Sequence, residues 1–109
     1  MRNPFQAMIE NQVASFQAQL TEAMAELAEL EVEGASGGGA VKVTLTGGGE
    51  VLRVAIDPEV LKGQDVELLQ DLVCAALRDG LTRVSEIKRE KIMRATPLGA
   101  LGMELPDIF

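Results

Sequence analysis

The sequence has no histidine, tyrosine or tryptophan, and its only cysteine is Cys74. Histidine is the commonest general base and a frequent metal ligand, so its absence removes the usual centre of an acid–base or metal site. The only aromatic residues are three phenylalanines, which leaves few platforms for stacking single-stranded bases. A lone cysteine cannot form an internal disulfide, and this favours a reducing cytoplasm.

Long hydrophobic runs are also missing. No apolar stretch approaches the roughly 20 residues that cross a bilayer, and the amino-terminal residues become polar too soon for a signal peptide. We therefore expect no membrane association. The length of 109 residues suits one domain, and an apolar fraction of 47% is enough for a modest core.

The charge is acidic overall and unevenly distributed. A formal net charge of −7 argues against a simple polyanion binder. Residues 1–33 contain one arginine and six glutamates, whereas residues 78–94 contain six cations and three acids. An acidic chain can therefore still have a basic end.

Residues 4–30 are predicted to form one long helix. Pro4 suits a first helical turn, and glutamine, alanine, leucine and glutamate dominate the rest. Apolar residues recur at alternating steps of four and three, the spacing of a coiled-coil seam. The seam residues are Ile9, Val13, Phe16, Leu20, Ala23, Leu27 and Leu30. Such a helix is about 40 Å long, so part of it must project or pack on another long helix.

Residues 31–56 are predicted to form three strands. Val41, Val43 and Leu45 alternate with polar residues, and we expect Leu52, Val54 and Ile56 to share one face of the next strand. The short glycine connection between these two segments indicates an antiparallel hairpin. Residues 65–94 then show a helical pattern. The predicted fold is α+β: α-β-β-β-α, with a three-stranded antiparallel meander between two long helices.

The predicted second helix begins after Asp57–Pro58, which favour a short helical turn, and Asp65, a candidate cap. Its expected apolar face consists of Val66, Leu69, Val73, Leu77, Leu81, Val84 and Ile87. Gly80 would weaken this helix unless something packs close to it. We assign residues 1–96 to a single domain. We expect residues 97–109 to form an irregular tail, mobile or docked only through Leu105 and Phe109.

The two glycine triplets, residues 37–39 and 47–49, raise the possibility of a phosphate loop. The first leads into a strand, and neither opens a helix or is followed by the lysine and hydroxyl of a P-loop. We interpret both as strand connections, although an exposed loop that touches a partner is also possible.

No pattern indicates an enzyme, a cofactor, a metal or a small-molecule substrate. The carboxylates that could pair are better explained as solvated strand or turn residues: Glu31, Glu33, Glu50, Asp57 and Glu59. Cys74 lies within the apolar stripe, and without a histidine to activate it we expect a buried small hydrophobe.

The basic end of the second helix has two interpretations. Its cations spread around the helix, and pairs such as Asp79–Arg83 and Glu90–Arg94 partly neutralise them, as on an ordinary solvated surface. The same cations could contact phosphates. The candidate DNA-binding residues are Arg2, Arg78, Arg83, Lys88, Arg89, Lys91 and Arg94.

The order of short motifs between residues 32 and 58 resembles the YbaB/EbfC family of nucleoid-associated proteins. The matching motifs are Val32-Glu33-Gly34, the glycines 37–39, Val41-Lys42-Val43, Thr46-Gly47, the segment 51–54 and Ile56-Asp57-Pro58. The second helix and the tail, with Leu101-Gly102, Leu105-Pro106 and Phe109, are similar too.

This resemblance implies a tweezer-shaped homodimer that binds double-stranded DNA, alters its conformation and contributes to nucleoid organisation and gene expression in the cytoplasm. The chain departs from the family in two places. Its first helix has a single cation, Arg2, and Asp107 stands where the family often has a lysine. The alternative is an acidic, dimeric protein–protein adaptor without direct DNA binding, for which the charge and the seam would suffice.

Overall fold

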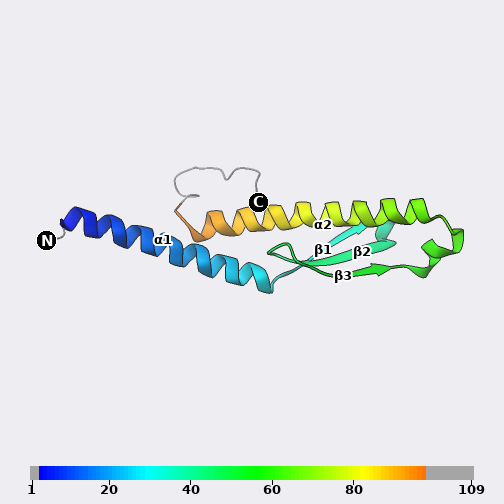
Figure 1. The fold of residues 1–109 in the computed structure, drawn as a ribbon, viewed down its shortest axis with the longest axis horizontal. Helices are drawn as coiled ribbons and strands as arrows, with labels where there is room; N and C mark the ends of the chain where they lie inside the picture. The colour runs from blue at the N-terminus through cyan, green and yellow to red at the C-terminus, as the bar shows by residue number, and fades with distance from the viewer. Residues whose placement is uncertain (1–2, 98–109) are drawn as a thin grey trace.

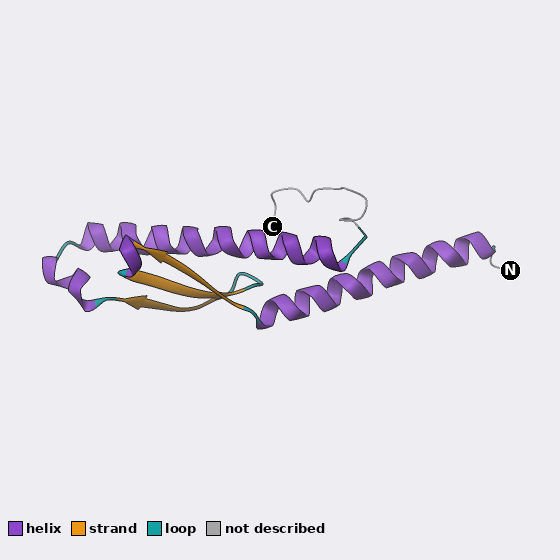
Figure 2. Ribbon diagram, turned by 180° about the vertical axis from the view of Figure 1, so that it is seen from behind, coloured by secondary structure: helices purple, strands orange, loops and turns teal. Residues whose placement is uncertain are grey.

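The computed structural model describes residues 3–97 (Figure 1). In chain order, the elements are α1 (Pro4–Glu29), β1 (Glu31–Ser36), η1 (Gly37–Gly39), β2 (Val41–Thr46), β3 (Val51–Ile56), η2 (Pro58–Gly63) and α2 (Val66–Ala95). Helix α2 lies along one face of the sheet, and α1 projects from the opposite end of the body to the η2 turn (Figures 1 and 2). The predicted α-β-β-β-α order and antiparallel meander are confirmed.

Helix α1 begins where its sequence predicts. The Asn3 side chain accepts a hydrogen bond from the Phe5 N–H at 3.0 Å, and Pro4 occupies the first turn. The helix ends at Glu29, and its cap residue Leu30 is extended and leads directly into β1. The helix projects away from the sheet, and among the described residues its buried side chains, Ala23 and Leu27, lie near its carboxyl end.

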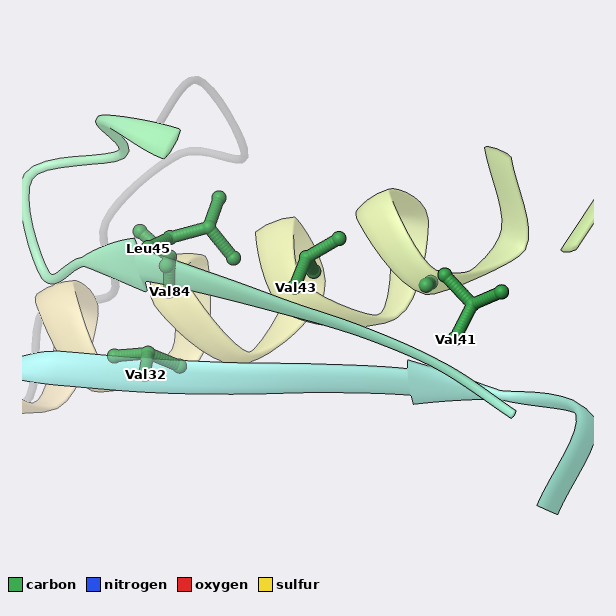
Figure 3. Close-up of a cluster of buried hydrophobic side chains, with 6 residues drawn as sticks. Val32, Val41, Val43, Leu45 and Val84 are labelled. Atoms are coloured by element: carbon green, nitrogen blue, oxygen red, sulfur yellow. The ribbon is translucent and has the colours of Figure 1, made fainter. Parts of the chain in front are cut away.

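The sheet has the order β1-β2-β3, with both pairs antiparallel. Val41, Val43 and Leu45 of β2 are fully buried, as their alternation predicts. Together with Val32 of β1 and Ala76 and Val84 of α2 they form the core (Figure 3). Strand β2 is central, so α2 can cover it together with β1.

Strand β3 departs from the predicted shared face at one residue, Leu52. A bulge opposite Thr44 and Leu45 places Val51, rather than Leu52, across from Leu45. Val54 pairs with Val43 and therefore faces the same side of the sheet. All residues of β3 are nevertheless exposed in the single chain, because α2 packs over β1 and β2 and leaves this edge strand uncovered.

Two glycines allow β1 and α2 to pack unusually closely. A Cβ on Gly34 would lie 2.4 Å from the Gly80 backbone nitrogen and 2.5 Å from the Ala76 carbonyl oxygen. Both glycines are buried. The sequence predicts that Gly80 weakens the helix unless something packs close to it. The structure shows this close packing, because β1 crosses α2 at Gly80.

The connections follow the predicted turn chemistry. Both glycine triplets join consecutive strands, the first as the η1 turn. Asp57 caps η2 by accepting from the Glu59 N–H at 3.0 Å, and Asp65 caps α2 by accepting from the Leu68 N–H at 2.9 Å. Helix α2 ends at Ala95. The expected irregular tail lies, apart from Pro97, outside the described residues, and so do its expected contacts through Leu105 and Phe109.

The prediction of which residues form the apolar face of α2 is partly wrong. The buried residues are Ala76, Gly80, Val84 and Ile92, whereas Val66 and Leu81 are exposed. Cys74 is exposed too, which corrects the expectation of a buried hydrophobe. The helix turns small residues toward the sheet because β1 crosses it so closely, and its larger residues lie beside β3.

Candidate DNA-binding surface

The helical geometry of α2 arranges four arginines in two rows. Arg78 and Arg89 are eleven residues apart, as are Arg83 and Arg94, and eleven residues make about three turns and 17 Å. Each pair therefore lies on one side of the helix, and the two rows lie on different sides. This confirms that the cations do not form a single stripe.

Two of these arginines form ion pairs within the helix. The Arg83 guanidinium lies 3.3 Å from the Asp79 carboxylate, and that of Arg94 lies 2.5 Å from Glu90. The side chains of Arg83 and Arg94 are 59% and 79% exposed. Exposed pairs of this kind contribute little free energy, so an incoming phosphate could displace the carboxylate. Arg78 is exposed as well, with its guanidinium 3.7 Å from the Cys74 sulfur.

Asp79 has a second role beside Arg83. Its carboxylate accepts a hydrogen bond from the Ala35 N–H of β1 at 2.9 Å. This bond is the main reason why the pKa of Asp79 lies below its ordinary value; desolvation opposes the shift, and the neighbouring Arg83 reinforces it. The carboxylate therefore links β1 to α2 and orients one arginine of the surface.

Lys91 is not an open cation in the single chain. Its ammonium group forms an ion pair with Glu26 of α1, and its side chain is only 31% exposed. This contact makes Lys91 less accessible to a phosphate than Arg83 or Arg94 is. Lys88 and Arg89 are half-buried, and Arg2 lies outside the described residues. The sequence could not reveal the Lys91 contact, because it joins helices more than sixty positions apart.

The opposite face of the sheet carries two cations that the sequence reasoning did not assign. Lys42 is exposed on β2, and Arg53 of β3 lies 3.6 Å from Glu31. Polar residues alternate with apolar ones along these strands, and this pattern could have placed both cations on the exposed face. Lys42 pairs with Ala55, and Arg53 pairs with Thr44. These positions alternate with the buried side chains of β2, so both cations lie on the face that α2 does not cover. They are thus separate from the basic end of α2.

An apolar groove runs between α2 and the exposed edge strand; we call it the α2–β3 groove. One part has a volume of about 420 Å³ and is lined by Ile56, Leu69, Gln70, Val73, Cys74 and Leu77. A second part, also about 420 Å³, continues along α2 past Leu81. Val51 and Val54 extend this surface, since they are 47% and 43% exposed on the same side of the sheet. Exposed apolar surfaces of this kind are typical of interaction sites.

The described residues contain no constellation that suggests catalysis or metal binding. Glu31 and Glu33 share the polar face of the sheet, and Glu31 is paired with Arg53. Within residues 3–97, no group of three or more potential metal ligands comes together. In the same range, no helix combines the length and apolar character that crossing a bilayer requires.

The model of the YbaB/EbfC DNA-binding family matches residues 2–100. The chain belongs to the YbaB/EbfC family. A nucleoid-associated protein of Dictyoglomus turgidum is 42% identical over 106 residues, covering 97% of this chain and 96% of the relative. The nucleoid-associated protein MCA1327 of Methylococcus capsulatus is 41% identical, covering 94% and 92%. The resemblance inferred from the motifs is thereby confirmed.

A solved structure shows the same fold. The uncharacterized protein HP0035 from Helicobacter pylori superposes with a TM-score of 0.70 at 24% sequence identity, covering 83% of this chain and 92% of that protein. The arrangement of helices and sheet is therefore shared with another protein at low sequence identity.

Proposed function

We propose that this protein is a nucleoid-associated protein that binds double-stranded DNA as a homodimer. It would act in the cytoplasm, on the nucleoid, altering DNA conformation and so contributing to nucleoid organisation and gene regulation. The observation that carries the proposal is the match to a DNA-binding family over nearly the whole chain. No cofactor or small-molecule substrate is needed for such a role.

The homodimer is supported by the α2–β3 groove. Strand β3 is an edge strand whose apolar side chains α2 does not cover. An uncovered edge beside an apolar groove is a liability for a monomer, and a second copy offers an equally apolar surface to cover it. We therefore place the dimer contact on β3 and the adjoining side of α2.

The DNA contact is assigned to the basic part of α2. The exposed guanidinium groups of Arg83 and Arg94 suit phosphates, and a homodimer would present each of them twice. Arg78 is exposed in the single chain, but it lines the α2–β3 groove and so lies at the proposed dimer contact. No pattern resembles a code for base edges, so contacts should be mainly to phosphates and sequence preference should be weak. The acidic α1 would then face away from the duplex or limit its approach. Arg2, Arg78, Lys88 and Arg89 remain candidates for additional contacts, and Lys91 would first have to leave Glu26.

The test is a binding titration at several salt concentrations with two unrelated duplexes. Replacing Arg83 and Arg94 by alanine should weaken binding equally on both. It should also flatten the dependence of log K on log salt by about one unit per lost phosphate contact. Lys62→Ala is the matched control, because Lys62 is an exposed cation on the distant η2 turn. An unchanged affinity and salt slope in the double variant would remove α2 as the DNA surface.

A second candidate function is the acidic protein–protein adaptor. The net charge of −7 and the six glutamates among residues 1–33 favour it. If the parent protein fails to bind duplex DNA even at about 50 mM salt, where phosphate contacts are strongest, the adaptor replaces the DNA-binding function.

A further inference from the structure

The apolar seam of α1 has two unlike halves. Near its carboxyl end, Ala23 and Leu27 are 2% and 0% exposed, because the end of α2 packs against them. Nearer the amino end, Ile9 and Val13 are 46% and 52% exposed. The heptad spacing continues without a break, so the sequence provides the same kind of contact surface along the whole helix. Only the inner half of that surface is used by the described residues of the chain.

The outer half of α1 would be weak on its own. It projects beyond the body of the protein (Figures 1 and 2). Most helical stability in proteins comes from tertiary packing of an apolar face rather than from the helix by itself. Residues 4–21 contain one charged residue, Glu10, so this half lacks both cations for DNA and the dense charge that keeps a solvated helix soluble. Phe5, Ile9, Val13 and Phe16 form what we call the outer α1 seam.

The last turn of α2 lies close to the outer α1 seam. Helix α2 runs antiparallel to α1, and its last turn lies beside the middle of α1 (Figures 1 and 2). A groove of about 500 Å³ lies between the helices at this point, lined on one side by Gln12, Ser15, Phe16 and Gln19, and on the other by residues 94–97. Pro97, the last described residue, is thus already in the groove that opens onto the outer α1 seam.

We propose that the outer α1 seam binds residues 98–109 of the same chain. These twelve residues can span up to about 40 Å, whereas Phe16 and Phe5 are about 17 Å apart along the helix. The segment is rich in large apolar residues, namely Leu98, Leu101, Met103, Leu105, Ile108 and Phe109. Its only charges are Glu104 and Asp107, and the only charged side chain that lines the described part of the groove is a cation, Arg94.

The covalent connection favours the chain's own segment over that of a second copy. A segment tethered by a few residues has an effective concentration in the millimolar range, far above micromolar protein in solution. Contacts too weak to hold a separate chain can therefore hold this one. The interaction does not depend on DNA, so it can be tested whether or not the proposed function holds.

Hydrogen–deuterium exchange on the full chain tests the contact. Leu105→Ser combined with Phe109→Ser should speed amide exchange in residues 5–16 by about tenfold or more, because the helix loses its partner. Val13→Ser should speed exchange of the amides in residues 98–109, whereas Ala14→Ser, one position off the seam, should not. Exchange rates that are the same in the parent and in the double variant would overturn the proposal.

A disulfide decides which chain supplies the segment. In a Cys74→Ser background, Val13→Cys is combined with Leu105→Cys or, in a second variant, with Leu101→Cys. Each variant is oxidised as a mixture of isotopically labelled and unlabelled chains. We expect mass spectrometry to find the disulfide within single chains. A disulfide that joins labelled to unlabelled chains, or no disulfide in either variant, would overturn the assignment.

Discussion

Gly34 and Gly80 mark the point where β1 and α2 come closest. A Cβ on Gly34 would meet backbone atoms at 2.4 and 2.5 Å, whereas a Cβ on Gly80 would first meet the tip of the Leu45 side chain at 2.4 Å. Backbone atoms of two packed elements cannot give way as a side chain can. The two glycines therefore differ in how strictly they are required.

Gly34→Ala should destabilise the protein strongly, by about 3 kcal/mol, at the upper end of the usual cost of overpacking. Gly80→Ala should cost less, because alanine gains about 1 kcal/mol of helix propensity that offsets part of the clash. Urea unfolding measures both. Gly63→Ala is the control, since nothing lies within 4 Å of its added Cβ. Equal stabilities for Gly34→Ala and Gly63→Ala would contradict the close crossing.

The stability of the fold should depend on whether Asp79 is ionised. Its pKa is lowered in the folded state, so its contribution to stability is present above the unfolded pKa and is lost as the pH falls through the folded pKa. The parent should therefore lose more melting temperature than Asp79→Asn as the pH is lowered below about 4. Thermal melts from pH 7 to pH 2.5 check this. Parallel curves for the two proteins would show that the hydrogen bond from Ala35 does not depend on the charge.

At the scale of elements, the described residues anchor α1 through its inner half. Leu27 is 0% exposed, and the Glu26–Lys91 ion pair lies beside it. Truncating this side chain leaves a cavity that neither helix can close by itself.

Leu27→Ala should therefore cost about 2–5 kcal/mol of unfolding free energy. Met24→Ala is the matched control on the same helix, because Met24 is 41% exposed and its loss should change stability by no more than about 0.5 kcal/mol. Chemical denaturation of the two variants separates the cases. Similar losses in both would mean that α1 is not anchored through its seam.

At the scale of the whole molecule, the proposed dimer unites the exposed edge strand with the apolar side of α2. Light scattering at micromolar concentration should give about twice the chain mass of 11.6 kDa. Val54→Asp should reduce the mass toward that of one chain, since it places an unpaired charge in the contact. Ala55→Asp, on the opposite face of the same strand, should leave the dimer intact. A parent protein that stays monomeric would rule out a second copy as the partner of the α2–β3 groove.

Features that depend on near neighbours in the chain could be predicted from the sequence. The caps at Asp57 and Asp65, the period-two burial of Val41, Val43 and Leu45, and the order of elements all follow from local hydrogen bonds and side-chain spacing. The spacing of residues along each helix also predicted which side chains form the apolar seam of α1 and which cations lie on α2. The motif order further pointed to the family, which the comparisons confirm.

Only the tertiary structure decided how these sets are used. It places β1 directly on Gly80, so α2 buries Ala76 and Gly80 at the crossing and leaves Cys74 and Leu81 exposed. It also pairs Lys91 with Glu26 and, among residues 3–97, covers the inner half of the α1 seam but not the outer half. Periodicity shows which residues share a face, but not how far a sheet extends beneath a helix or where two helices meet. Those are set by packing between elements distant in sequence, and no local pattern encodes them.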